Sequence, residues 1–257
     1  MISQPSGLFS GATIVEMKAN NRVDTYYGSE TNFAFVVENG DVGDDIIKSF
    51  GRDDSLITHA KIFDGNKDGM IAFGRNGLLD IDRVSSRKAG NDQLKLEDQN
   101  GSIGEIRYLG ETSGQYVYAS AATLHGFYDK YLFGIEGTVG DDRISFHDDT
   151  MGYEGPGALL VDNRLGLNLG HDSISDMREG DSIVTTRKLA DADTNGIPDG
   201  FSNKRGEAVL DLRAADGTSV GTIQFEVSAS HFALVAVGSF EHDNQVFYRY
   251  ELQALDT

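Results

Sequence analysis

Two acidic loops carry the residues of the sequence that are best suited to binding chemistry. Both fit the pattern D-x-[DN]-x-[DN]-G, the first half of a calcium loop of the EF-hand type. The oxygen-bearing side chains at positions 1, 3 and 5 are Asp64, Asn66 and Asp68 in the first loop, and Asp191, Asp193 and Asn195 in the second. Ca²⁺ takes six to eight oxygen ligands at roughly 2.3–2.6 Å, so this spacing predicts a Ca²⁺ site in each loop.

The positions that follow extend both ligand sets. Position 6 is glycine in each loop, which permits the sharp turn that such a site needs. Position 7 offers a backbone carbonyl, that of Met70 in the first loop and Ile197 in the second. Position 9 of the second loop is Asp199, which adds a carboxylate that can bind directly or through water.

The bidentate glutamate that usually stands at position 12 is missing from both loops, where Arg75 and Ser202 take its place. A remote carboxylate must therefore complete each site, or the site stays weak. The candidates are acids that recur at matching places around the two loops: Asp54 with Asp181, and Asp80 with Asp211. Asp, Asn and Gly also favour plain turns, which is the alternative reading of each loop. Two loops in register within a repeat favour calcium.

An internal repeat surrounds the loops. Residues 44–57 align with 171–184, so that Asp45 matches Asp172, and the register continues through the loops themselves. The matching segments extend to residues 101–108 and 218–225, with a longer connection in the first copy. We therefore expect two homologous units, residues 1–135 and 136–257.

The elements that must position these loops are mainly strands. Residues 246–255 alternate with period two, which places Val246, Tyr248, Tyr250 and Leu252 on one face. Similar strands are expected at residues 32–37, 104–109, 115–120, 222–227 and 231–238. No segment shows a sustained helical period, so helices should be few and short. The sequence predicts a mainly β protein of two sandwich-like or roll-like units.

Three short segments resemble the degenerate G-x-D-x-hydrophobic repeats of secreted, hemolysin-type RTX calcium-binding proteins: residues 42–47, 137–144 and 169–174. Residues 28–57 also resemble the segment that follows the nonapeptide repeats in that family. The chain lacks a run of consecutive repeats, which argues against a long calcium-filled β-roll. The resemblance implies type I secretion from a bacterium, calcium-dependent folding outside the cell, and no catalysis by this module.

Composition limits the other functions. The 257 residues include 22 Lys and Arg against 41 Asp and Glu, a formal net charge of −19, which argues against nucleic acid and anionic membrane surfaces as partners. Cysteine is absent, so disulfides and thiolate sites are excluded. The start has no basic region followed by an apolar run, and no stretch approaches the roughly 18 apolar residues of a membrane helix, so neither a cleaved signal peptide nor membrane insertion is expected.

Enzyme signatures are weak. The histidines show no H-E-x-x-H spacing, there is no G-x-S-x-G, and His147 beside Asp148 and Asp149 is expected to be structural or solvent-exposed. The expected function is an extracellular calcium-binding module with a structural, adhesive or ligand-binding role. The alternative is a secreted polysaccharide-active enzyme or carbohydrate-binding protein with structural calcium, whose groove would be lined by Tyr26, Tyr27, Tyr116, Tyr118, Tyr248 and Tyr250. A third interpretation is a cytoplasmic β protein whose acidic turns bind no calcium.

Overall fold

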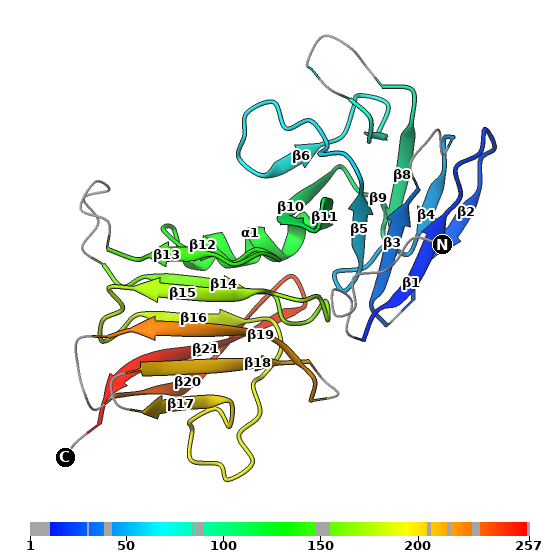
Figure 1. Ribbon diagram of the computed structural model, residues 1–257. Helices are drawn as coiled ribbons and strands as arrows, with labels where there is room; N and C mark the ends of the chain where they lie inside the picture. Colours follow the sequence, from blue (N-terminus) through cyan, green and yellow to red (C-terminus); the bar gives the residue numbers. More distant parts are fainter. Residues whose placement is uncertain are drawn as a thin grey trace. The chain divides into compact units, whose positions relative to one another are not determined.

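The computed structural model describes residues 11–29, 31–38, 43–83, 85, 90–147, 155–204, 207–214, 217–227 and 232–255. Within these residues the chain is mainly β, with one helix, α1 (Ala121–Lys130) (Figure 1). The chain divides into two compact units, Met1–Leu124 and His125–Thr257. Residue 135, at which the sequence analysis divides the chain, begins the first strand of the second unit.

In the first unit, the first strands of the chain alternate between two sheets and pair in parallel within each sheet. One sheet contains β1 (Thr13–Met17), β3 (Phe33–Val37) and β5 (Ser55–Thr58). The other contains β2 (Thr25–Tyr27), β4 (Ile46–Lys48) and β8 (Gln93–Asp98). Successive strands of the chain therefore form the two layers of a short roll, and apolar side chains such as Phe35 and Ile47 are buried in its core.

Antiparallel strands complete both sheets of the first unit. The first sheet continues through β11 (Gln115–Ser120), β10 (Glu105–Thr112) and β6 (Met70–Ala72). In the second sheet, β7 (Leu79–Asp80) and β9 (Gly101–Ser102) both pair with β8. The first acidic loop connects β5 to β6, so it joins two strands of the same sheet.

The second unit follows a similar path, except that the strand after its acidic loop belongs to the second sheet, whereas β6 belongs to the first. Its first sheet has the parallel strands β12 (Ile135–Glu136), β14 (Ala158–Val161) and β16 (Ser182–Thr185), followed by the antiparallel β21 (Gln245–Ala254) and β20 (Phe232–His242). Its second sheet has the parallel strands β13 (Arg143–Ser145), β15 (His171–Ser175) and β19 (Ser219–Glu226), followed by the antiparallel β18 (Glu207–Arg213) and β17 (Phe201–Lys204). The order of parallel and antiparallel strands is thus similar in the two units, while their descent from one ancestral repeat stays a prediction.

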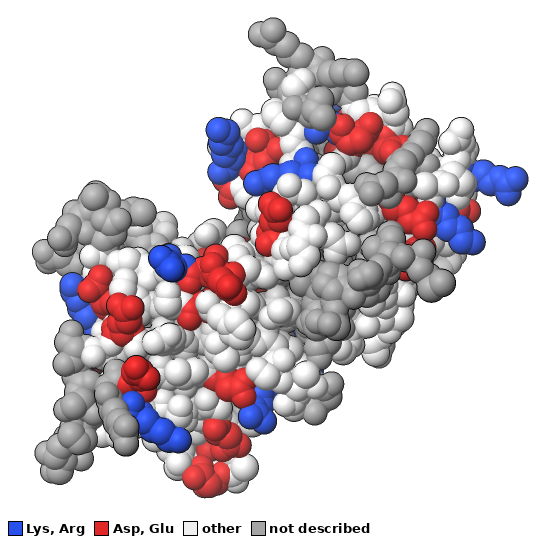
Figure 2. All heavy atoms as spheres, viewed as in Figure 1, with Lys and Arg blue, Asp and Glu red and all other residues white. Residues whose placement is uncertain are grey.

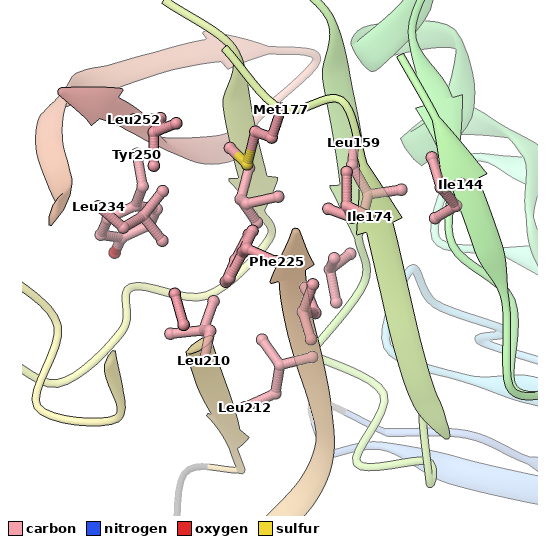
Figure 3. Packing of buried hydrophobic residues seen from close by; sticks show 14 of the residues in the cluster. Ile144, Leu159, Ile174, Met177, Leu210, Leu212, Phe225, Leu234, Tyr250 and Leu252 are labelled. Carbon is pink, nitrogen blue, oxygen red and sulfur yellow. The ribbon is translucent and has the colours of Figure 1, made fainter. Parts of the chain in front are cut away.

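Apolar side chains from both sheets form the core of the second unit (Figure 3). Leu159 comes from the first sheet, Ile174 and Phe225 come from the second, and all three are almost completely buried. All four residues of β16, directly before the second acidic loop, are buried. The loop therefore starts from a strand that packing holds firmly.

Both faces of β21 bury large side chains. Tyr250 and Leu252 are buried on one face of the expected alternation, and Phe247, on the opposite face, is also completely buried. The pairing of β20 with β21 is interrupted by a bulge between Ala236 and Gly238. The extra residue of this bulge, Val237, lies in β20, so the alternation of β21 itself is unbroken. Phe247 stacks on Phe240, with ring centroids 4.9 Å apart.

Candidate metal centre

The second acidic loop gathers three carboxylates. Asp191, Asp193 and Asp199 each place one oxygen so that all three atoms lie within 4.8 Å of one another. Asp193 and Asp199 are exposed and Asp191 is half-buried, so an ion could reach the group from solvent. The sequence predicted these three residues as ligands, and the fold brings their oxygens together.

Hydrogen bonds from the loop backbone fold the chain around Asp191. Its Oδ1 accepts from the amide of Asn195 (3.1 Å), and its Oδ2 accepts from the amide of Gly196 (3.0 Å). Thr194 and Gly196, at positions 4 and 6, have φ values of 57° and 84°. The left-handed conformation is readily available to glycine and costs a threonine energy. The loop thus has the sharp turn that the sequence pattern predicts.

Asn195 and Asp199 close the loop. The amide nitrogen of the Asn195 side chain donates to Asp193 (2.9 Å), while its oxygen accepts from the backbone amide of Ile197 (2.7 Å). Asp199 accepts from the amide of Ala192, at 3.1 and 3.2 Å from its two oxygens. The side chains of Asp193, Asn195 and Asp199 offer carboxylate or amide oxygens, the ligands that a hard cation such as Ca²⁺ prefers. A bound ion would replace the contact between Asn195 and Asp193.

The first acidic loop has a similar backbone pattern, although Oδ1 of its first aspartate accepts from position 4 where the second loop uses position 5. Asp64 accepts from the amide of Lys67 (2.8 Å) through Oδ1 and from the amide of Gly69 (2.8 Å) through Oδ2. Lys67 and Gly69 have φ values of 62° and 80°, matching positions 4 and 6 of the second loop. Asn66 donates to Asp68 (2.6 Å), and Asp68 also accepts from the amide of Met70 (2.8 Å).

The two loops differ in their carboxylates. Within the described part of the chain, only the Asp191 group brings three acidic or histidine side chains close enough to hold one ion. The first loop has two carboxylates, Asp64 and Asp68, and Ala72 stands where the second loop has Asp199. Its cation site would therefore depend more on Asn66, on backbone oxygen and on water.

Asp54 and Asp181, which the sequence offered as remote ligands, are used elsewhere. Each directly precedes the strand that leads to a loop, so about 13 Å of extended strand separates it from the loop. Asp54 is completely buried and accepts from the amides of Phe33 (2.8 Å) and Gly51 (2.7 Å). Burial raises its pKa to about 6, although these hydrogen bonds oppose the change.

Asp181 has the corresponding position in the second unit. Its carboxylate accepts from the amides of Gly157 (2.6 Å) and Arg178 (2.7 Å), and it lies 2.9 Å from Nε2 of His147. His147 and Asp181 are both buried, which fits the structural role expected for the histidine. Asp148 and Asp149 lie outside the described residues. The carboxylates of Asp54 and Asp181 thus connect turns and strands rather than the acidic loops.

The other pair of remote candidates also has partners. Asp80 accepts from the amide of Gly90 (2.8 Å), and burial followed by the neighbouring Asp82 raises its pKa. Asp211 forms an ion pair with Arg213 (2.8 Å) and accepts a hydrogen bond from Ser219. Neither residue is part of the three-carboxylate group of Asp191, Asp193 and Asp199.

Two buried aspartates were aligned by the repeat but not proposed as site residues. Asp45 directly precedes β4 and Asp172 lies within β15, and each accepts a hydrogen bond from a backbone amide, that of Asp24 (2.7 Å) or Asp142 (3.0 Å). Burial is the main cause that raises both pKa values, that of Asp172 to about 7. The recurring G-x-D-x-hydrophobic pattern was the signal that could have identified them. Val42, within the first of those segments, lies outside the described residues.

The six tyrosines offered as groove residues differ in burial. Tyr118 and Tyr250 are buried, Tyr26, Tyr116 and Tyr248 are half-buried, and Tyr27 is exposed.

Within the described part of the chain, no helix combines the length and the hydropathy needed to cross a membrane. Comparison of the chain with protein-family models, curated proteins and solved structures found no match.

Proposed function

We propose that this protein binds calcium, with its principal site in the loop of residues 191–199. The observation that carries the proposal is the convergence of oxygens from Asp191, Asp193 and Asp199 within 4.8 Å. Three carboxylates at this separation repel one another, and a divalent cation between them would relieve that repulsion. The oxygen-only donor set favours Ca²⁺ over softer metals.

The loop of residues 64–70 is proposed as a second, weaker site. Its support is the matched backbone, with left-handed residues at positions 4 and 6 and the same hydrogen bond from the amide of position 6 to the aspartate at position 1. It offers Asp64, Asn66 and Asp68 as side-chain ligands. Its affinity should be lower because it has one carboxylate fewer.

The further proposal is that calcium couples folding to an extracellular location. The chain has a formal net charge of −19, and Figure 2 shows acidic residues in several separate groups on one face. Ions bound only by the folded chain contribute their binding energy to folding. The resemblance to secreted RTX proteins supports type I secretion, after which the module would act as a structural, adhesive or ligand-binding element.

Thermal unfolding in millimolar calcium and in excess chelator tests the proposal. A ligand bound only by the folded state stabilises it by about 2.7 kcal/mol when its concentration is 100 times Kd. The melting temperature should therefore be several degrees higher in calcium, and Asp193→Asn should remove most of the difference. Glu226→Gln, an exposed charge change in β19, is the matched control. Identical melting curves in calcium and chelator would contradict the proposal.

The alternative, a carbohydrate-binding or polysaccharide-active protein with structural calcium, has less support. Its groove would need converging tyrosines, and two of the six, Tyr118 and Tyr250, are buried in the cores of their units. The calcium proposal does not depend on which of these roles the module has.

A further inference from the structure

A cleft of about 290 Å³ opens beside the second acidic loop. Its walls come from the chain on both sides of the loop and from the end of β18. Among the residues that the structure describes, its charged lining residues are Arg187, Lys188, Asp199, Asp211 and Arg213. Three basic residues thus line one cleft in a chain that has only 22 Lys and Arg among 257 residues.

The three basic residues differ in how they are held. Arg213 is oriented by Asp211, whose Oδ2 lies 2.9 Å from Nε and 2.8 Å from Nη2, and Ser219 in turn donates to Asp211. An arginine fixed along one edge keeps further N–H donors for a ligand. The side chains of Arg187 and Lys188 form no hydrogen bond or ion pair with the described residues, so their charges are not neutralised by a carboxylate there.

We infer that this cleft binds a compact oxyanion, the carboxylate or phosphate group of a small molecule. In the described lining, three cationic side chains outnumber two carboxylates, so an anionic group would be attracted to the cleft. Guanidinium groups form charge-assisted hydrogen bonds with the paired oxygens of carboxylates and phosphates, and lysine adds a point charge. The volume admits a group of about monosaccharide size.

The position of Asp199 couples the cleft to the proposed metal site. This residue belongs to the three-carboxylate group and also lines the cleft. A cation held by the loop would neutralise Asp199 and remove its repulsion of the anion, so the two ligands should bind cooperatively. By linkage, the anion should raise calcium affinity by the same factor. This coupling rests on the proposed calcium function, whereas the basic cleft does not.

A titration followed by NMR of the ¹⁵N-labelled chain tests the inference. The probes are D-glucuronate for the carboxylate, glycerol 3-phosphate for the phosphate, and glucose and glycerol as neutral controls. An anionic probe should cause saturable shifts at residues 187–190, 198–200 and 211–214. The double variant Arg187→Gln/Lys188→Gln should bind the anion roughly tenfold more weakly, because two charged partners are lost. Arg143→Gln/Arg178→Gln removes the same charge at exposed positions of the same unit and should bind normally.

The outcomes distinguish anion binding in the cleft from calcium binding by the 191–199 loop. Equal weakening of anion binding in both double variants, or the absence of saturable shifts with both anions, would contradict the inference that the cleft binds an oxyanion. A response to one anion alone identifies the group that the cleft selects and supports the inference. Repeating the titration in chelator should give weaker binding. Equal anion affinity in calcium and chelator, in a sample shown by calorimetry to bind calcium, would overturn the coupling. Absence of calcium binding with intact anion binding would overturn the proposed function while supporting the cleft.

Discussion

The hydroxyl oxygen of Tyr250 accepts a 2.8 Å hydrogen bond from the backbone amide of Leu189, two residues before Asp191. Tyr118 does the same in the first unit, accepting from the amide of Ile62 at 2.8 Å, two residues before Asp64. Each tyrosine is buried and comes from the antiparallel strand that pairs with the strand before the loop. Each acidic loop is therefore attached at its start to the core of its own unit.

Replacing Tyr250 by phenylalanine should lower the free energy of unfolding by about 1 kcal/mol, because the buried amide of Leu189 loses its acceptor. It should also weaken calcium binding by the 191–199 loop, whose first ligand is two residues away. Tyr118→Phe, the matched control, should destabilise its own unit similarly and leave that loop unaffected. Urea unfolding and calcium calorimetry measure the two effects, and equal calcium affinities for both variants would contradict this positioning role.

The 191–199 loop should fill with calcium before the 64–70 loop. It has three converging carboxylates, whereas the first loop has two and carries Lys67, whose charge opposes the cation. In a calorimetric titration, Asp193→Ala should remove the tighter step and Asp68→Ala the weaker one. A tight step that survives Asp193→Ala but disappears in Asp68→Ala would reverse the ranking.

Asp172 should make the protein less stable as the pH rises. Its pKa in the folded state is about 7, raised by burial from an ordinary 3.8, so between these values the folded chain keeps a proton that the unfolded chain has lost. The contribution of Asp172 to the free energy of unfolding is fully present below pH 3.8 and is lost as the pH rises through 7. Asp172→Asn, which cannot ionise, should lose less stability between pH 5 and pH 8 than the unaltered chain. Urea unfolding at both values measures this.

The control for that comparison is Asp176→Asn, an exposed change in the same unit. It should show the same loss of stability between pH 5 and pH 8 as the unaltered chain. A pH dependence that is the same in Asp172→Asn and in Asp176→Asn would show that Asp172 does not titrate differently in the folded state.

Asp181 should act on stability rather than on calcium affinity. Asp181→Ala leaves the amides of Gly157 and Arg178 and the ring of His147 without their acceptor, which should cost about 2–4 kcal/mol. The loss should be the same in calcium and in chelator, as measured by chemical unfolding. If the calcium-dependent part of the stability disappears instead, Asp181 is the remote ligand that the sequence offered.

Much of the strand content follows from the sequence alone. Period-two and apolar segments predicted strands where β3, β10, β11 and β19 lie, because side chains of a strand alternate between core and solvent. The bulge at Val237 of β20 could not be predicted, since it is created by pairing with β21. Local alternation contains no information about such a bulge.

The sequence by itself also determined the donor order and turn chemistry of the acidic loops. Asp, Asn and Gly at fixed spacing produce the left-handed turn and its short hydrogen bonds through local geometry, as in the turn from Asp191 to Gly196. Only the tertiary structure decided which distant carboxylates are near them. Asp54 and Asp181 are held by backbone amides of neighbouring turns, and Asp211 by Arg213, because strand pairing brings together partners that are far apart in the chain. A buried carboxylate must find such donors when the strands pack, and spacing along the sequence cannot show which donors those will be.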